Sequence, residues 1–226
     1  MIPQRKFLGE GISMRFDKRL MLVGVIAVSG LLSGCAPILV GGAAITSATV
    51  MTDRRSTGSI VNDEVLEKRV AYEIQQAIGY ERHHISVTSY DGKVLLSGEV
   101  ASEQEKMVAQ RVASQSVDVA SVLNELAVMD PSSVPTRISD SMLATKVRST
   151  IIATKQISLN QMKVTVERGI VYLMGIVTAV EADTASRTAA EVSGVQQVVA
   201  CFSVESEEQV RQRLKDLQTS APADEK

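Results

Sequence analysis

The sequence predicts an α+β fold of two tandem domains, each with the element order α-β-β-α-β and with its helices on one face of a three-stranded mixed sheet. Three observations predict it: an internal repeat, apolar stripes with helical spacing, and pairs of alternating strands around tight turns. Adding 77 to the residue number carries ten positions of the first half onto identical residues in the second. The first-half positions are Leu66, Val70, Ile74, Val87, Thr88, Gly92, Val94, Leu96, Gly98 and Val100.

Each copy begins with an amphipathic helix. Leu66, Val70, Ile74 and Ile78 recur at every fourth residue, which predicts a helix from about residue 63 to residue 78 that buries one stripe. The repeat places the matching helix around Leu143, Val147 and Ile151 in the second copy.

A β-hairpin follows in each copy. Residues 85–90 and 93–98 alternate apolar and polar side chains around Asp91-Gly92, and residues 162–167 and 170–175 do the same around Arg168-Gly169. A two-residue hairpin turn requires positive φ angles, and glycine adopts these without strain. Both turns are therefore predicted to be tight.

A second helix and a third strand complete each copy. Ser102-Glu103-Gln104-Glu105 has capping-box spacing and predicts a helix to about Ser114, with a counterpart from about Ala179 to Ser193. The closing strands are predicted at residues 122–128 and 198–204. The two domains then occupy residues 63–130 and 139–205.

The segments outside the domains also have recognisable composition. Residues 131–138 contain Pro131 and Pro135, which is typical of a short stiff linker. Residues 206–226 begin with a second capping-box pattern at Ser206 and predict a C-terminal helix, followed by a disordered tail from about Thr219.

The N-terminal segment has the layout of a secretory signal peptide. Thirteen uncharged residues, from Leu20 to Leu32, follow a basic cluster, and this stretch is shorter than the roughly 20 apolar residues that span a bilayer. We therefore expect residues 1–34 to be removed. Met14 is the expected start, because counting from it places the positive charge at the front of the signal.

Leu32-Ser33-Gly34-Cys35 resembles the lipobox of bacterial lipoproteins at all four positions. The resemblance implies that Cys35 becomes the first residue and carries a diacylglyceryl group and a further acyl chain, which together hold a protein on a membrane almost permanently. Residues 35–62 would be the lipidated tether. Ala36 rather than aspartate after the cysteine implies the outer membrane, with the protein on its periplasmic face.

Composition limits the remaining functions. The predicted signal removes five bases and two acids, so the mature chain is mildly acidic and has no general attraction for nucleic acid. Tryptophan is absent and aromatic residues make up 3% of the chain, so the core must be aliphatic. Lipid on Cys35 leaves Cys201 without a partner for a disulfide, and we expect Cys201 to be a small buried residue.

The hairpin pattern Gly-x-Val-x-Leu-x-Gly-x-Val, at residues 92–100 and 169–177, within an α-β-β-α-β unit resembles the BON domain. Two such domains behind a lipobox are similar to the dual-BON outer-membrane lipoproteins. This family resemblance implies a periplasmic protein that binds anionic phospholipid through its second domain and supports envelope integrity. It implies no catalytic residues, and outer-membrane proteins are further possible partners.

The family's lipid-contacting surface is the first helix of the second domain. Leu143, Val147 and Ile151 cluster on its core side at 100° per residue, whereas Met142 lies on the opposite side beside Lys146. The family has tryptophan where Met142 stands, and methionine lacks the interfacial anchoring of an indole. The alternative is that Met142 simply covers the domain surface or the linker. The predicted phospholipid-binding residues are Met142, Thr145, Lys146, Arg148, Ser149 and Ile152.

Other polar residues do not form a site in the sequence. His83 and His84 are adjacent and would point to opposite faces of a strand, so they predict a surface turn rather than a metal site. Arg54-Arg55 is expected to be a solvated charge pair, with contact to lipid headgroups as the alternative, and four carboxylates are expected on solvated faces. No nucleophile–base pair or ligand set is visible, so neither an enzyme nor a cofactor is predicted. An adaptor that docks envelope proteins or cell wall is the alternative function. The four carboxylates are Asp140, Glu167, Glu181 and Asp183.

Overall fold

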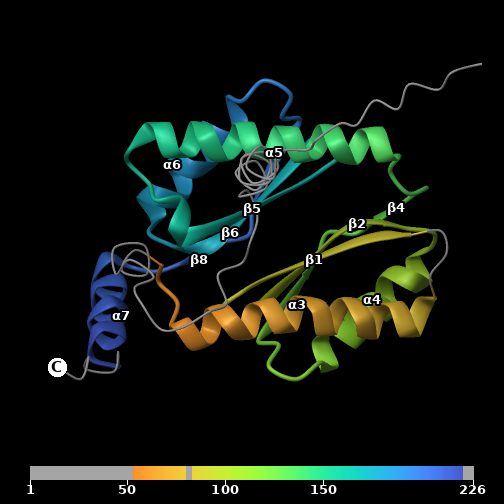
Figure 1. The fold of residues 1–226 in the computed structure, drawn as a ribbon, viewed down its shortest axis with the longest axis horizontal. Helices are drawn as coiled ribbons and strands as arrows, with labels where there is room; N and C mark the ends of the chain where they lie inside the picture. Colours follow the sequence, from red (N-terminus) through yellow and green to blue (C-terminus); the bar gives the residue numbers. More distant parts are fainter. Residues whose placement is uncertain (1–52, 80–82, 221–226) are drawn as a thin grey trace, which may run out of the picture. The chain divides into compact units, whose positions relative to one another are not determined.

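The computed structural model describes residues 53–79 and 83–220, which form two domains with the same order of elements (Figure 1). The first domain contains α3 (Thr57–Ile78), β1 (His84–Tyr90), β2 (Lys93–Val100), α4 (Glu103–Gln115), β3 (Ser121–Asn124) and β4 (Ala127–Val128). The second contains α5 (Val134–Thr154), the 3-10 helix η1 (Leu159–Gln161), β5 (Met162–Glu167), β6 (Ile170–Val177), α6 (Ala179–Ala190), β7 (Gln197–Ala200) and β8 (Ser203–Val204), and α7 (Glu207–Ser220) follows it. The predicted α+β repeat is confirmed.

Both sheets are mixed and have the same topology. The hairpin strands pair antiparallel, β1 with β2 and β5 with β6, and the closing segments pair parallel to the central strand of each hairpin. Each closing strand is broken into two short pieces rather than continuous. In the first domain the break follows Asn124, whose side chain accepts from the Leu126 amide and donates to the Lys106 carbonyl oxygen.

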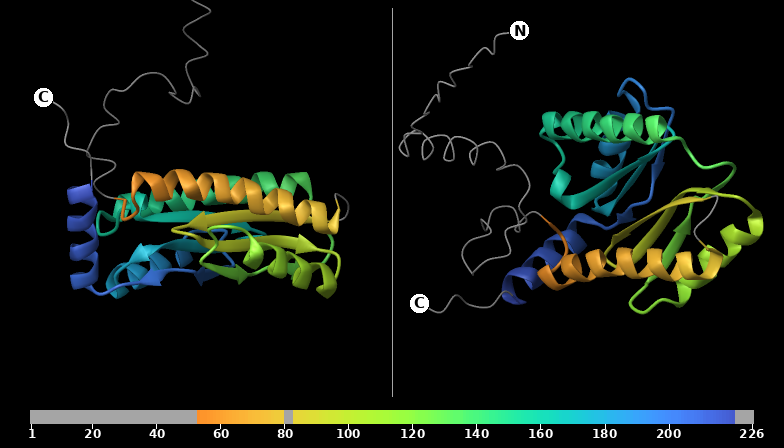
Figure 2. Two further views of the ribbon diagram at one scale, coloured as in Figure 1. Left: turned by 90° about the horizontal axis from the view of Figure 1, so that it is seen from below. Right: turned by 45° about the vertical axis from the view of Figure 1, so that its right-hand side comes forward.

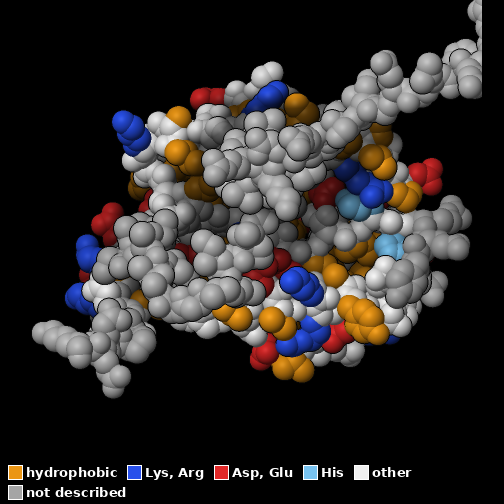
Figure 3. All heavy atoms as spheres, viewed as in Figure 1, with side chains coloured by type: hydrophobic (Ala, Val, Ile, Leu, Met, Phe, Trp, Pro, Cys, Tyr) orange, Lys and Arg blue, Asp and Glu red, His pale blue; other side chains and the backbone are white. Residues whose placement is uncertain are grey.

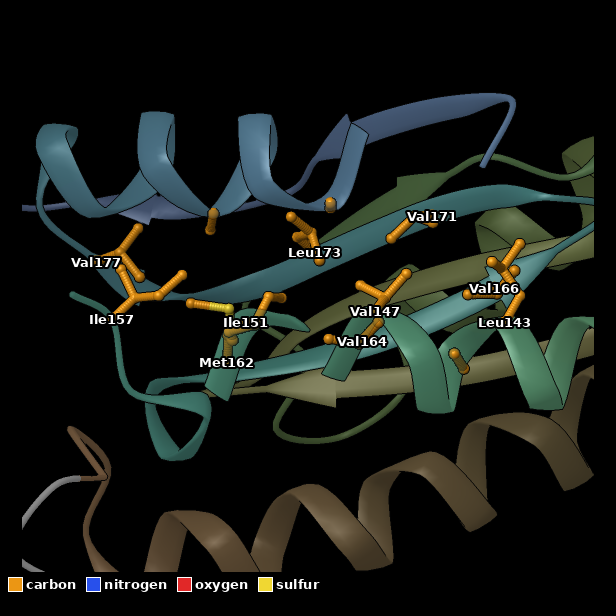
Figure 4. Packing of buried hydrophobic residues seen from close by; sticks show 13 residues of the cluster. Leu143, Val147, Ile151, Ile157, Met162, Val164, Val166, Val171, Leu173 and Val177 are labelled. Carbon is orange, nitrogen blue, oxygen red and sulfur yellow. The ribbon is translucent and has the colours of Figure 1, made fainter. Parts of the chain in front are cut away.

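Each domain buries the apolar stripes of its two helices against one face of its sheet. In the first domain Leu66, Val70 and Ile74 pack on the central strand, and in the second Val147 and Ile151 do so. Figure 4 shows the second core, where side chains from α5, β5 and β6 point into the space between helices and sheet. The helical periodicity therefore identified the core faces correctly.

Two helices begin earlier than the sequence predicted. α3 begins at Thr57, because the Ser56 hydroxyl accepts from the Ser59 amide and caps the helix. α5 begins at Val134, inside the predicted linker, where Ser133 is the N-cap and a proline occupies the first turn. The apolar stripe does not extend to either helix start, because the first turns of both helices are largely exposed.

Two different structural constraints require glycine in the hairpins. Asp91 and Gly92, like Arg168 and Gly169, both have positive φ, which is the geometry of a tight two-residue turn. Gly98 lies where a Cβ would collide with the carbonyl oxygen of His84. The spacing of the glycines thus follows from a turn and a close approach of two backbones.

The two sheets pack against each other through the faces that carry no helices. The buried cluster between them contains Tyr90 and Leu95 of the first domain and Tyr172, Met174 and Cys201 of the second. The helices lie on the outer side of each sheet (Figure 2). Both central strands are consequently buried on both faces, since side chains of β2 and β6 enter either a domain core or this cluster.

Candidate functional site

The outer face of α5 carries an exposed apolar stripe that polar residues interrupt between Met142 and Ile152. Val134, Ile138, Met142 and Ile152 are between 58% and 67% exposed. At 100° per residue they lie opposite the buried Leu143 and its core neighbours, so the sheet cannot cover them. The structure therefore exposes Met142 to solvent.

The polar residues predicted on this helix are exposed as well. Thr145, Lys146 and Ser149 lie on or beside the stripe. Arg148 lies on one flank, where its guanidinium donates to the Val164 carbonyl oxygen. All six predicted lipid-contacting residues are thus on the solvent side of α5, with Arg148 tied partly to the sheet.

The exposed charges of α5 are all basic. Lys146 and Arg148 are exposed, Arg137 is half-buried and donates to the Ser132 carbonyl oxygen, and the one acid, Asp140, is buried. The Asp140 carboxylate accepts hydrogen bonds from the amides of Arg168 and Gly169, at 2.8 and 2.9 Å. The carboxylate of Asp140 therefore faces the interior of the domain, and the outer surface of the helix is positive.

Sequence reasoning missed the first half of the stripe. The linker predicted at residues 131–138 includes Val134 and Ile138, although their spacing of four residues continues to Met142. This spacing in the sequence indicates that the helix and its exposed apolar face begin closer to the N-terminus.

The corresponding face of α3 shares the apolar pattern but not the charge. Val61 and Val65 stand at the repeat positions of Ile138 and Met142, and with Tyr72 they are between 48% and 61% exposed. The remaining charges of α3 apart from the buried Asp63 are three acids and two bases, against three bases and no exposed acid on α5. The acids are Glu64, Glu67 and Glu73, and the bases are Lys68 and Arg69.

A shallow polar groove runs beside α5. One part, of about 440 Å³, is lined by residues of both domains, including Glu67, Arg148 and Lys163, and a second part of about 370 Å³ also includes Arg148. The Lys163 ammonium bonds Glu67 at 2.8 Å across the domains. Figure 3 shows acidic and basic side chains close together on this side of the molecule. Of the two basic groups in the groove, Arg148 is the one without an acidic partner among the described residues.

Of the four carboxylates predicted on solvated faces, Asp140 and Glu167 are buried and Glu181 is half-buried, which corrects the prediction for these three. Asp140 holds the hairpin turn, and Asp63 does the same in the first domain by accepting from the Asp91 and Gly92 amides at 2.8 and 3.0 Å. Asp183 alone is exposed, in an ion pair with Arg187 one helical turn away. The Asp63–Asp140 pair is an eleventh position of the 77-residue repeat, and its role is structural.

Of the other two carboxylates, Glu181 pairs with Arg54, and Glu167 joins the two domains. Glu167 of β5 accepts from the Ser86 hydroxyl at 2.5 Å and lies 3.5 Å from His84 Nε2. Burial opposes its ionisation, but His84 and Ser86 hold the pKa of Glu167 below its usual value. His84 begins β1 rather than lying in a turn, and the described residues contain no group of side chains suited to a metal.

Arg54 and Arg55 are also buried, so the expectation of a solvated charge pair is wrong. Arg54 forms a two-point contact with Glu181, at 2.7 and 2.8 Å, and donates to the Ile176 carbonyl oxygen at 2.9 Å. Arg55 bonds Asp53 and Asp63 and lies 4.0 Å from the ring centre of Tyr90. The physical reason is that the fold adds a carboxylate to each guanidinium, Glu181 to Arg54 and Asp63 to Arg55.

Two expectations concern cysteines. Cys201 is buried as predicted, and burial raises the pKa of its thiol to about 11. Cys35, the predicted signal at residues 1–34, most of the tether and the tail after Ser220 lie outside the described residues. The tail was expected from about Thr219, but α7 includes Thr219 and Ser220. Within residues 53–79 and 83–220, no helix combines the length and hydrophobicity needed to cross a membrane.

Comparison with known proteins agrees with this architecture. The BON domain family matches the chain twice, at residues 62–130 and 139–206. The chain is 34% identical over 172 residues to "Outer membrane lipoprotein DolP" of Haemophilus influenzae, which covers 76% of this chain and 89% of that protein. It is also 34% identical over 148 residues to the "21 kDa hemolysin" of Actinobacillus pleuropneumoniae, covering 65% of this chain and 76% of that one.

Among solved structures, the C-terminal domain of CdsD, a structural protein of the type III secretion system of Chlamydia trachomatis, covers 67% of this chain and all of its own length. It is 10% identical with a TM-score of 0.27, which carries no argument. The repeat, the α-β-β-α-β order and the two matched regions lead to one conclusion: this chain is a two-domain member of the BON domain family.

Proposed function

We propose that the protein is a non-enzymatic lipoprotein on the periplasmic face of the outer membrane, where the outer face of α5 binds anionic phospholipid and supports envelope integrity. The observation that carries this proposal is the combination of four exposed apolar side chains with exclusively basic exposed charge on one helix. Its relative from Haemophilus influenzae is called an outer membrane lipoprotein, which supports the location.

The helix has the chemistry of an interfacial element. Its apolar stripe can enter the boundary between headgroups and acyl chains, while Lys146 and Arg148 remain level with the phosphates. A base near an anionic membrane contributes about 1 kcal/mol, so the charges of α5 and the stripe act together. Met142 adds apolar area but no indole, and we therefore expect weak binding by α5 alone.

An acyl anchor would make weak binding sufficient. Cys35 and the first described residue, Asp53, are separated by a segment that can extend to at most about 60 Å. Attachment at Cys35 would therefore keep α5 near the bilayer, and a high effective concentration compensates for low affinity.

Vesicle sedimentation tests the proposal on the mature chain with Cys35→Ser, which removes acyl anchoring. The test variant is Met142→Glu with Lys146→Glu, and the matched control is Met107→Glu with Lys106→Glu on α4. Met107 is 60% exposed and has exposed polar neighbours, so the control changes charge and exposed methionine equally. We expect the α5 variant to abolish sedimentation with phosphatidylglycerol vesicles and the control to retain it. Equal sedimentation of both variants would refute the proposal.

A second candidate function is an adaptor that docks envelope proteins or cell wall. The observation that favours it is the exposed face of α3, where Val61, Val65 and Tyr72 stand among charges of both signs. A stoichiometric partner that is captured without lipid, and lost on Val65→Glu with Tyr72→Glu, would support this function. Retention of that partner by the variant would exclude the α3 face as its docking surface.

A further inference from the structure

The predicted tether enters the described structure through a buried three-residue segment. We call Asp53, Arg54 and Arg55 the clasp segment. All three residues are less than 10% exposed, although each carries a charge. Burial of three consecutive charged side chains requires partners for every one of them, because an unpaired buried charge is strongly destabilising.

The two arginines of the clasp segment bind different domains. Arg54 contacts only the second domain in the described contacts, through the Glu181 carboxylate at the start of α6 and the Ile176 carbonyl oxygen in β6. Arg55 contacts the first domain, through Asp63 in α3 and the ring of Tyr90 at the end of β1. Adjacent residues lie about 3.8 Å apart along the backbone, so this segment ties the two domains at one place.

The partners of the clasp segment are themselves held in position. Glu181 also accepts from the Thr178 amide in the capping box of α6. Asp63 accepts from Ser89 and from both amides of the first hairpin turn. Neither carboxylate can follow an arginine away from its domain without losing these bonds. Separation of the domains must therefore break the contacts of Arg54 or those of Arg55.

We infer that the clasp segment is an interdomain lock, in which Arg54 holds the second domain and Arg55 holds the first, so that the membrane tether is fastened to the closed pair of domains rather than to one of them. This inference is independent of lipid binding at α5. It assigns Arg54 as a positioning residue, whose loss opens the interface between the two sheets without unfolding either sheet.

Cys201 provides a natural reporter of that opening. Its thiol lies in the buried cluster between the sheets, in the same cluster as Tyr90, Leu95 and Tyr172, and it is 5% exposed. The chain has two cysteines, so Cys35→Ser leaves Cys201 as the one reactive thiol. A thiol reagent then modifies the chain at a rate that follows the population of the open state.

The experiment measures the labelling rate of Cys201 by a maleimide in the whole chain with Cys35→Ser. Arg54→Ala is the test variant, and Glu181→Gln removes the charge and one of the two acceptor oxygens of the same contact in case the first variant folds poorly. Arg69→Ala is the control, because among the described residues Arg69 bonds only within the first domain, to the Val117 carbonyl oxygen and Asp118. Circular dichroism confirms that each variant retains its secondary structure.

We expect Arg54→Ala and Glu181→Gln each to accelerate labelling at least tenfold, which corresponds to about 1.4 kcal/mol. The two changes together should be no faster than either one, since both remove a single contact. Arg69→Ala should label at the parent rate. Labelling of folded Arg54→Ala and Glu181→Gln within twofold of the parent, or additive effects in the double variant, would overturn the inference.

Discussion

Asp140→Asn tests whether buried carboxylates fix the first helix of each domain to its hairpin. The carboxylate of Asp140 accepts two amide hydrogen bonds, from Arg168 and Gly169 in the β5–β6 turn. Asparagine preserves the volume and one acceptor, but its amide group faces the second backbone N–H. Loss of one charge-assisted bond costs about 1.5–3 kcal/mol, and the unsatisfied donor adds about 1–3 kcal/mol.

The expected loss of unfolding free energy is therefore about 3 kcal/mol, measured by urea unfolding with far-UV circular dichroism. Asp183→Asn is the matched control, because its exposed i,i+4 ion pair with Arg187 contributes about 0.5 kcal/mol or less. Asp63→Asn should cost more than Asp140→Asn, since Asp63 also binds Ser89 and Arg55. A change below 0.5 kcal/mol for Asp140→Asn, about the size of the control, would refute the reasoning.

Three further outcomes follow from the same contacts. Folding lowers the pKa of Asp63 from its ordinary value of 3.8 and the pKa values of Glu167 and Glu181 from 4.5. Their contribution to the free energy of unfolding is therefore complete above about pH 4.5 and is lost as the pH falls through the pKa values of the folded state. Glu167→Gln should make the stability of the chain less dependent on pH in acid, as measured by urea unfolding at several pH values. Gly98→Ala should destabilise the chain by at least about 2 kcal/mol in urea, because its Cβ would meet the His84 carbonyl, whereas Gly58→Ala in the open first turn of α3 should not. Glu64→Lys with Glu73→Lys makes the exposed face of α3 more basic, and in the Met142→Glu, Lys146→Glu background it should restore part of the lost vesicle sedimentation. If sedimentation does not recover, the difference in charge between α3 and α5 does not explain which helix binds lipid.

Much of the fold could be predicted because its signals are local. The Asp91-Gly92 turn and the stripe of Leu66, Val70 and Ile74 each depend on neighbours along the chain, the ten repeated positions transfer them to the second domain, and the structure confirms them. Helix starts were less accurate, because capping by Ser56 and Ser133 extends α3 and α5 beyond the apolar stripe. Periodicity identifies the buried face of an element but not where its exposed first turn begins.

The polar interior could not be predicted, because its partners are distant in sequence. Arg54 meets Glu181 across 127 positions, and Ser86 meets Glu167 across 81. A charged pair after an uncharged stretch is usually solvated, so the sequence favoured exposure for Arg54-Arg55. The repeat does contain one indication of a buried carboxylate, because Asp63 and Asp140 are also 77 residues apart. An acid that is repeated within the core-facing stripe of a helix indicates a buried carboxylate with a fixed partner.

The duplicated helices α3 and α5 have similar exposed apolar faces but different charges. α3 and α5 occupy the same place in their domains, and both leave a line of large apolar side chains uncovered on the side away from the sheet. Shape alone would therefore give the two domains the same partner. The acids of α3 would be repelled by an anionic bilayer, whereas α5 has no exposed acid and its bases are attracted to it. Since the helices lie on opposite outer sides of the packed sheets, α5 can face lipid while α3 remains available to a different partner.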